Sequence, residues 1–224
     1  MDAVFREICT ISVEPDGMAF DPASVRSEVI RGEDEYHGMR VYFQATLGTA
    51  ILPMQIDIGF SDRIEPKAVR MEFPTWLEMP QPVLRCYAPE TVVAEKFEAL
   101  ISLGLVNSRL KDYYDLYTLS NSFDFEGEIL TLALSTTFET RQTLLPDGVP
   151  DGLTPQYIQP NIVHWKAFLK RISADATLEL ETVVDRLKIF LLPPLNAIQA
   201  GANFRCRWEK GHDWLYPKNT AGET

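Results

Sequence analysis

Charged side chains that could take part in phosphate or metal chemistry occur at three places in the sequence. The first is Asp57, which lies between Ile56 and Ile58 in a segment of alternating apolar and polar residues. Aspartate is disfavoured inside strands, because its short charged side chain packs poorly on a pleated surface. Asp57 is therefore either a solvated residue on an exposed sheet face or a carboxylate that projects from the sheet to bind a metal ion. The pattern alone leaves both open.

The second place is Lys96, in a segment with helical periodicity over residues 89–103. Val92, Val93 and Phe97 belong to the apolar side of this predicted helix, and Lys96 lies on or beside that side. A lysine there can run along the apolar surface and place its ammonium group in water. The alternative is a cation held over a cleft, where it neutralises a phosphate or a carboxylate.

The third place is a run of charged residues in the next predicted helix. Asp112 and Asp115 are three residues apart and share one helix face, and Lys111 can pair with Asp115 at a spacing of four. Arg109 adds a second cation. The run is either an ordinary solvated helix face or one wall of a polar site, and the spacing does not separate these two interpretations.

The residues before Pro89 read as strands and turns. Apolar and polar side chains alternate in residues 40–47 and again in residues 51–60, which predicts a β-hairpin with one apolar face. Asp57 is expected on the face opposite the apolar stripe. Further elements are predicted as a strand over residues 8–13, a short helix over residues 21–30 and a short strand over residues 84–87.

From Pro89 onward the hydrophobic period is helical, and a segment rich in Pro, Gly and Asp over residues 144–159 reads as a surface loop. Helices are predicted over residues 89–103, 109–119, 129–139, 162–172 and 178–192, with the last ending before Pro193 and Pro194. This layout is typical of an α+β fold, with a small sheet region in residues 1–88 and a helical region in residues 89–224.

The composition excludes several classes of function. No uncharged run is long enough to cross a bilayer, and the N-terminus lacks the basic and apolar regions of a signal peptide, so we expect a cytoplasmic protein. The three cysteines and three histidines are scattered, which argues against a zinc site or a disulfide framework. A net charge of −11 opposes broad electrostatic binding to nucleic acid and leaves room for a local basic groove.

Three segments, taken in order, resemble successive motifs of the AbiEii/AbiGii toxin family. They are QIDIGFSD at residues 55–62, VAEKFEAL at residues 93–100 and NSRLKDYYDL at residues 107–116. The similarity extends to the EPDG turn at residues 14–17 and to YHG at residues 36–38. Each motif alone is weak, and their order makes the resemblance specific.

The members of this family are toxins of bacterial type IV toxin–antitoxin and phage-defence systems. The resemblance implies a polymerase-β-like nucleotidyltransferase sheet followed by a helical region. It also implies Mg²⁺-dependent transfer of a nucleotide from an NTP to an acceptor, with tRNA as the acceptor class of related toxins. An antitoxin would be linked genetically, without a stable complex being implied.

The resemblance also implies roles for individual residues. Asp57, Lys96 and Asp112 match the family's catalytic positions. Asp57 matches a metal-site carboxylate suited to activating the acceptor hydroxyl, Lys96 the lysine that faces the triphosphate, and Asp112 the acid of the last motif. Lys96 is thereby also a nucleotide-binding position, together with Arg109, Lys111 and Asp115.

The chain departs from the family at its first motifs. It contains no Gly-Gly or Gly-Ser and no Asp-x-Asp on a predicted strand, so we expect an N-terminally truncated member. One carboxylate cannot hold two Mg²⁺ ions, which leaves open whether the chain is an enzyme. The alternatives are a non-catalytic remnant or interaction protein of the same fold, and an unrelated α+β protein with solvated charged helices.

Overall fold

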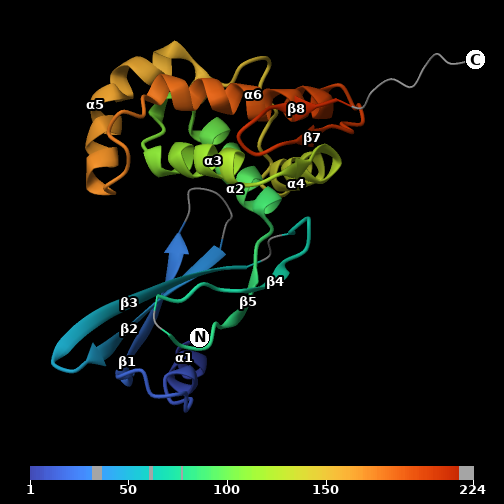
Figure 1. Ribbon diagram of the computed structural model, residues 1–224. Helices are drawn as coiled ribbons and strands as arrows, with labels where there is room; N and C mark the ends of the chain where they lie inside the picture. The colour runs from blue at the N-terminus through green and yellow to red at the C-terminus, as the bar shows by residue number, and fades with distance from the viewer. Residues whose placement is uncertain (32–36, 61–62, 77, 217–224) are drawn as a thin grey trace, which may run out of the picture. The chain divides into compact units, whose positions relative to one another are not determined.

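The computed structural model describes residues 1–31, 37–60, 63–76 and 78–216 of the chain. Six α-helices and small antiparallel sheets in these residues confirm the predicted α+β class (Figure 1). The chain forms two compact units, Met1–Asp62 and Arg63–Thr224. The division at residues 88 and 89, which rests on the change of sequence period, stays a prediction. Tyr36, Ser61 and Asp62, which carry part of the family resemblance, lie outside the described residues.

The first unit is a three-stranded antiparallel sheet with one short helix. Its elements are α1 (Asp2–Ile8), β1 (Met18–Arg31), β2 (His37–Leu47) and β3 (Ala50–Gly59), with the strands in the order β1-β2-β3. The predicted hairpin is confirmed, because β2 and β3 pair from Gly38 opposite Gly59 to Leu47 opposite Ala50. Gly48 at its turn has a φ of 58°, a left-handed conformation that glycine adopts without steric cost.

Two local predictions for this unit are wrong. Residues 8–13 are not a strand, since they contain the end of α1 and the segment after it, and residues 21–30 belong to β1 instead of a helix. β1 pairs with β2 on both sides of a register shift between Asp21 and Arg26. These inter-strand hydrogen bonds join residues distant in sequence, so a local window does not reveal them.

The sheet has one apolar and one polar face. The apolar face carries Val25, Val41, Phe43, Met54 and Ile58, and Phe5 of α1 and Cys9 at its end pack against them. On the other face Arg40 of β2 lies directly opposite Asp57 of β3. Asp57 therefore lies on the polar face, as the alternation predicts.

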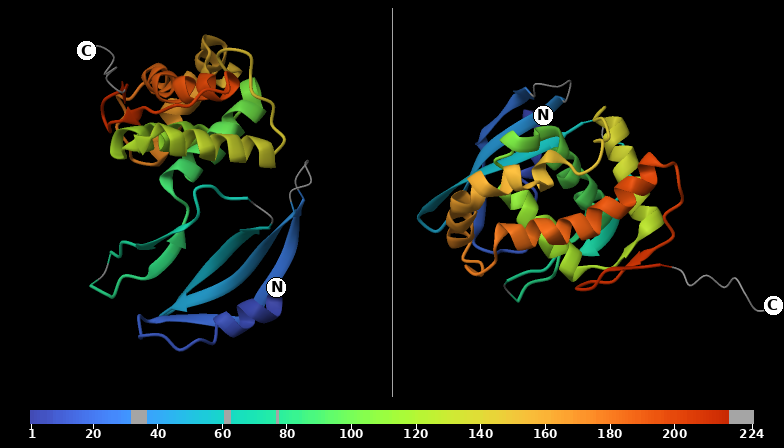
Figure 2. Two further views of the ribbon diagram at one scale, coloured as in Figure 1. Left: turned by 90° about the vertical axis from the view of Figure 1, so that its right-hand side faces the viewer. Right: turned by 90° about the horizontal axis from the view of Figure 1, so that it is seen from above.

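The second unit contains five α-helices and short strand pairs within its described residues (Figure 2). The hairpin of β4 (Val69–Glu72) and β5 (Val83–Cys86) precedes α2 (Pro89–Leu103). Then follow η1 (Gly104–Val106), α3 (Leu110–Ser122), β6 (Phe125–Glu126), α4 (Gly127–Thr140), η2 (Asp151–Leu153), α5 (Pro155–Arg171), α6 (Leu180–Gln199), β7 (Arg207–Trp208) and β8 (Trp214–Leu215). α2 begins at Pro89 and ends before Gly104, as predicted.

The helices enclose one large core. Its largest fully buried side chains are mostly aromatic and include Trp165, Trp208, Tyr113, Tyr157 and Phe97. Tyr113 of α3 stacks on Tyr157 of α5 with ring centroids 4.9 Å apart. Because these rings come from α3 and α5, their packing fixes the start of α3, where the charged run begins.

Two helix boundaries differ from the predictions by several residues, and the others by three residues or fewer. α5 begins at Pro155, inside the predicted loop, because proline is favourable in the first turn of a helix. α6 continues through Pro193 and Pro194 to Gln199 instead of ending at residue 192. Pro194 and Leu195 are buried, so their packing offsets the backbone hydrogen bonds that proline removes. In the residues that the structure describes, no helix is both long enough and apolar enough to span a membrane.

Candidate functional site

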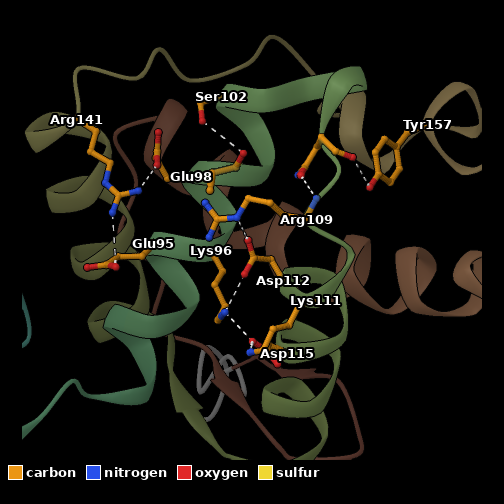
Figure 3. Close-up of polar contacts among 12 residues, drawn as sticks. Glu95, Lys96, Glu98, Ser102, Arg109, Lys111, Asp112, Asp115, Arg141 and Tyr157 are labelled. Carbon is orange, nitrogen blue, oxygen red and sulfur yellow. Dashed lines mark hydrogen bonds and ion pairs between the residues drawn. The ribbon is translucent and has the colours of Figure 1, made fainter. Parts of the chain in front are cut away.

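Lys96 lies between two carboxylates of the neighbouring helix. Its Nζ donates to Asp112 Oδ1 at 2.9 Å and to Asp115 Oδ2 at 2.7 Å (Figure 3). The Lys96 side chain is 18% exposed and that of Asp112 is 5% exposed, so the ammonium group does not extend freely into water. Lys96 thus pairs with two carboxylates of the protein, and its role toward a phosphate stays a prediction.

Two further cations, which are more exposed than Lys96, contact the same carboxylates. Arg109 Nε lies 2.7 Å from Asp112 Oδ2, and Lys111 Nζ donates to Asp115 Oδ2 at 2.6 Å. The Arg109 N–H is not aligned with Oδ2, so this buried oxygen has an electrostatic partner but accepts no hydrogen bond within the described residues.

These five residues, Lys96, Arg109, Lys111, Asp112 and Asp115, form what we call the charge cluster. Its three cations and two carboxylates leave a formal charge of three minus two, or +1. The whole chain carries −11, so this is a local reversal of sign. A cluster with surplus positive charge and partly buried walls is suited to an anionic group such as phosphate.

The start of α3 is fixed by local and distant contacts. Asn107 Oδ1 accepts a hydrogen bond from the Arg109 backbone N–H at 2.8 Å, which turns the chain into the helix. The Asn107 backbone oxygen accepts from the Tyr157 hydroxyl at 3.0 Å. The Tyr113 hydroxyl donates to the Gly152 oxygen at 2.9 Å. The positions of Asp112 and Asp115 relative to α2 therefore depend on packing against α5 and η2.

The charge of Lys96 is maintained by its partners. Burial by itself lowers the pKa of Lys96, but the hydrogen bonds to Asp112 and Asp115 raise it by more, and the net pKa is raised. Lys96 is therefore a permanent cation at neutral pH and is unsuited to act as a base. It can balance the charge of a phosphate or hold the two carboxylates in place.

A second ionic group, which sequence reasoning missed, lies further along α2. Glu98 is 3% exposed, and its carboxylate accepts from Arg141 Nη1 at 2.6 Å and from Thr143 Oγ1 at 2.5 Å (Figure 3). Arg141 Nη2 also lies 3.5 Å from Glu95. The helical period could have indicated this residue, because Glu98 lies with Ala94 and Phe97 on the buried side of the helix. This group ties α2 to the end of α4.

Asp57 belongs to the first unit and has its own partners there. Its two oxygens accept from Arg40 Nε at 2.7 Å and Nη2 at 2.8 Å, and one of them also accepts from Gln55 at 3.2 Å. The hydrogen bond from Arg40 holds the pKa of Asp57 below its usual value. The structure thus brings five of the six predicted site residues together within the second unit and places Asp57 in an exposed ion pair of the first unit.

The residues present do not fit the expected Mg²⁺ ion. Among the described residues, no group of three or more His, Cys, Asp or Glu side chains is arranged to hold a metal. The carboxylates of Asp57, Asp112 and Asp115 each face a cation of the protein instead of an open position. We therefore derive no chemical step through a metal ion.

Comparison with known proteins shows the family of the chain. The family model of the nucleotidyl transferase AbiEii toxin, of type IV toxin–antitoxin systems, matches residues 1–186. The chain belongs to this family. No curated protein and no solved structure matches it. The matched residues include the whole charge cluster and extend from α1 into the first turns of α6.

Proposed function

We propose that this chain is a nucleotidyltransferase-like toxin in which the charge cluster binds the triphosphate of an NTP. The observation that carries the proposal is the position of Lys96, held between Asp112 and Asp115 with Arg109 and Lys111 outside them. The family membership supports nucleotide transfer as the reaction. The same proposal includes a polymerase-β-like fold, tRNA as the acceptor, and a role in phage defence in the cytoplasm.

The reaction would place negative charge where the cluster has positive charge. An acceptor hydroxyl attacks the α-phosphorus, a new P–O bond forms, the α,β-anhydride bond breaks, and pyrophosphate leaves with the bonding electrons. Lys96, Arg109 and Lys111 would balance the charge that develops on the leaving pyrophosphate. The hydroxyl proton would pass to Asp57, the carboxylate that the family resemblance assigns to activating the acceptor hydroxyl. Lys96 is unsuited as the base because its pKa is raised.

Asp57 and Mg²⁺ enter the proposal from the family resemblance. Asp57 would have to release its two hydrogen bonds from Arg40 before it could accept one from the acceptor hydroxyl. If this release occurs, Asp57→Ala abolishes transfer and Arg40→Ala does not. An antitoxin is expected as a genetic partner that forms no stable complex with the chain.

The test is transfer of α-labelled NTPs to bulk tRNA in the presence of Mg²⁺. We expect Lys96→Met to lower the transfer rate by about a hundredfold or more, because it removes a cation that balances developing charge. Asp112→Asn should also lower the rate, because Lys96 loses a carboxylate that holds it in place. Lys188→Met is the control, since Lys188 forms a more exposed ion pair with Asp185 at 3.0 Å outside the cluster. Equal activity of Lys96→Met and Lys188→Met would contradict the proposal.

A non-catalytic protein of the same fold is the second candidate function. It is favoured by the pairing of each carboxylate in the charge cluster with a cation of the protein. In that case the cluster is structural, no NTP is transferred to tRNA by the folded wild-type chain, and Lys96→Met lowers only stability. The same set of variants therefore distinguishes the two functions.

A further inference from the structure

The hairpin of β4 and β5 presents an unpaired strand edge. β4 pairs with β5 on one side, from Val69 opposite Cys86 to Glu72 opposite Val83. In the part of the chain that the structure describes, no strand pairs with the other side of β4 (Figure 1). All four residues of β4 are exposed. Such an edge carries N–H and C=O groups that can pair with a further strand.

The hydrogen-bond pattern of the hairpin shows which backbone groups face the free edge. The Phe73 N–H donates to the Pro82 oxygen at 2.9 Å, so this is a hydrogen-bonded pair of the ladder. Hydrogen-bonded and non-hydrogen-bonded pairs alternate along an antiparallel ladder. Met71 therefore also directs its N–H and C=O toward β5. The N–H and C=O groups of Arg70 and Glu72 point to the free edge.

The side chains along this edge are complementary to a second copy of themselves. Residues 69–73 read Val-Arg-Met-Glu-Phe. When two such strands lie antiparallel about a two-fold axis at Met71, Arg70 of each copy lies opposite Glu72 of the other. Val69 of each copy lies opposite Phe73 of the other. Opposite charges and apolar side chains that face each other directly stabilise an antiparallel pair of strands.

The backbone geometry permits the same register. Met71 opposite its own counterpart is a non-hydrogen-bonded pair, because its N–H and C=O point to β5. The neighbouring pairs of Arg70 with Glu72 are then hydrogen-bonded pairs, which use the groups that point to the free edge. A shift by one residue would join the apolar face of one hairpin to the polar face of the other. Side-chain charge and backbone pattern therefore select one register independently.

The charged residues of this edge lack partners within a single chain. Arg70 lies directly opposite Arg85, and neither forms an ion pair with another described residue. Glu72 likewise has no ion pair among the residues that the structure describes. Like charges directly opposite each other destabilise a strand pair. A glutamate of a second copy, placed opposite Arg70, would offset this repulsion.

The other face of the hairpin is apolar and accessible. Val69, Met71, Phe73 and Leu84 are 43–50% exposed. Soluble monomers rarely expose large contiguous apolar patches, and such patches mark interaction sites. In the paired arrangement, Val69 of one copy partly covers Phe73 of the other. The short ladder buries less than a standard interface of about 1,600 Å², so the resulting dimer is weak and reversible.

We propose that β4 is a dimerisation edge, at which two copies of the chain pair antiparallel about Met71 with reciprocal contacts between Arg70 and Glu72. The dimer contains one four-stranded sheet in the order β5-β4-β4-β5. Its interface is isologous, because the same residues of both copies form it. The proposal goes beyond the proposed function and does not depend on the charge cluster.

The test is sedimentation equilibrium of the full chain over a dilution series that reaches about 1 mM. We expect the wild type to change from monomer to dimer within this series. Arg70→Glu brings two carboxylates together at each contact, and Glu72→Arg brings two guanidinium groups together. Each should weaken the dimer by about tenfold or more, because two attractive pairs become repulsive. Lys170→Glu, the same change of charge at an exposed residue of α5, is the control and should dimerise like the wild type.

Mixing the two single variants tests the register itself. In a heterodimer of Arg70→Glu with Glu72→Arg, every contact again joins opposite charges. We therefore expect association of the mixture at concentrations where each variant alone is monomeric. The double variant Arg70→Glu with Glu72→Arg should regain self-association, because the exchange of the two charges restores both contacts. Recovery in either experiment also shows that the altered hairpins are folded.

Three results would overturn the proposal. The first is a wild-type chain that stays monomeric throughout the series. The second is a dimer that Arg70→Glu and Glu72→Arg weaken no more than Lys170→Glu does. The third is a loss of association in both single variants that neither mixing nor the double variant restores. Since sedimentation uses no nucleotide, none of these results bears on nucleotide transfer.

Discussion

Lys96 Nζ of α2 and Asp112 Oδ1 of α3 are 2.9 Å apart, and both side chains are largely shielded from water. This contact joins two segments that are separated in sequence by η1 and the turn before α3. A buried ion pair gives little net stability relative to apolar packing, but the loss of one partner leaves an uncompensated charge. The pair therefore makes the relative position of α2 and α3 sensitive to single substitutions.

Replacing Lys96 should destabilise the protein. In Lys96→Met, Asp112 keeps a contact with Arg109 but loses its inner cation, while Asp115 keeps Lys111. We expect a loss of about 2–4 kcal/mol in the free energy of unfolding, measured by urea denaturation. The control Lys188→Met breaks a more exposed pair and should cost about 0.5 kcal/mol or less. Equal losses in the two variants would show that Lys96 and Asp112 are not coupled.

The contribution of Lys96 to stability should disappear at alkaline pH. Its pKa is raised above the ordinary 10.5, since the hydrogen bonds that it donates to the two aspartates outweigh the effect of burial. The folded state thus favours the protonated form. The resulting stability is fully present below pH 10.5 and is lost as the pH rises through the raised pKa.

This pH dependence is measured as the difference in unfolding free energy between the wild type and Lys96→Met, from neutral pH to above pH 10.5. The difference should be constant at first and then shrink. Using the difference removes the contributions of other groups, such as Tyr113, whose pKa is raised by burial in the folded state, so that it ionises more readily on unfolding. A difference that stays constant across the whole range would contradict the assigned ion pair.

Arg40 should set the acidity of Asp57. The hydrogen bond from Arg40 holds the pKa of Asp57 below its ordinary 3.8, so the stability from this pair is present above 3.8 and is lost as the pH falls through the lowered value. In Arg40→Gln the pKa of Asp57 should rise toward 3.8, as followed by NMR of the carboxyl carbon. Asp175, whose pKa is lowered by the Thr177 backbone N–H and hydroxyl, is an internal reference that should not move.

Glu98 should matter for stability more than an exposed glutamate does. Its carboxylate is buried and accepts from Arg141 and Thr143, so Glu98→Gln replaces charge-assisted hydrogen bonds by weaker ones. We expect a loss of about 2–4 kcal/mol in the free energy of unfolding. Glu128→Gln, at a largely exposed pair with Arg205, should change it by about 0.5 kcal/mol or less. The outcome that would contradict the assignment is an equal urea midpoint for both variants.

Parts of both units could be predicted from the sequence. Pro89 and Gly104 mark the ends of α2, and the spacing of Asp112 and Asp115 places both on one face of α3. The alternation in residues 40–47 and 51–60 likewise predicts the hairpin and the polar face that carries Asp57. These features depend on local backbone preference and on side-chain period, which a short window of sequence contains.

Other features were decided by contacts between distant segments. β1 is a strand because it pairs with β2, and α6 passes through Pro193 and Pro194 because the residues after them are buried in the core. For Lys96, the sequence did not show whether the ammonium group contacts water or an anionic partner. The packing of α3 on α2 determines this, because it brings Asp112 and Asp115 to the ammonium group.

The sequence by itself therefore determined which side chains could form a polar site, since their types and their helix faces are local properties. The tertiary structure alone decided that these side chains neutralise one another with one positive charge left over. The physical reason is that electrostatic energy and burial depend on distances between groups, and the fold sets those distances by packing elements that are far apart in the chain.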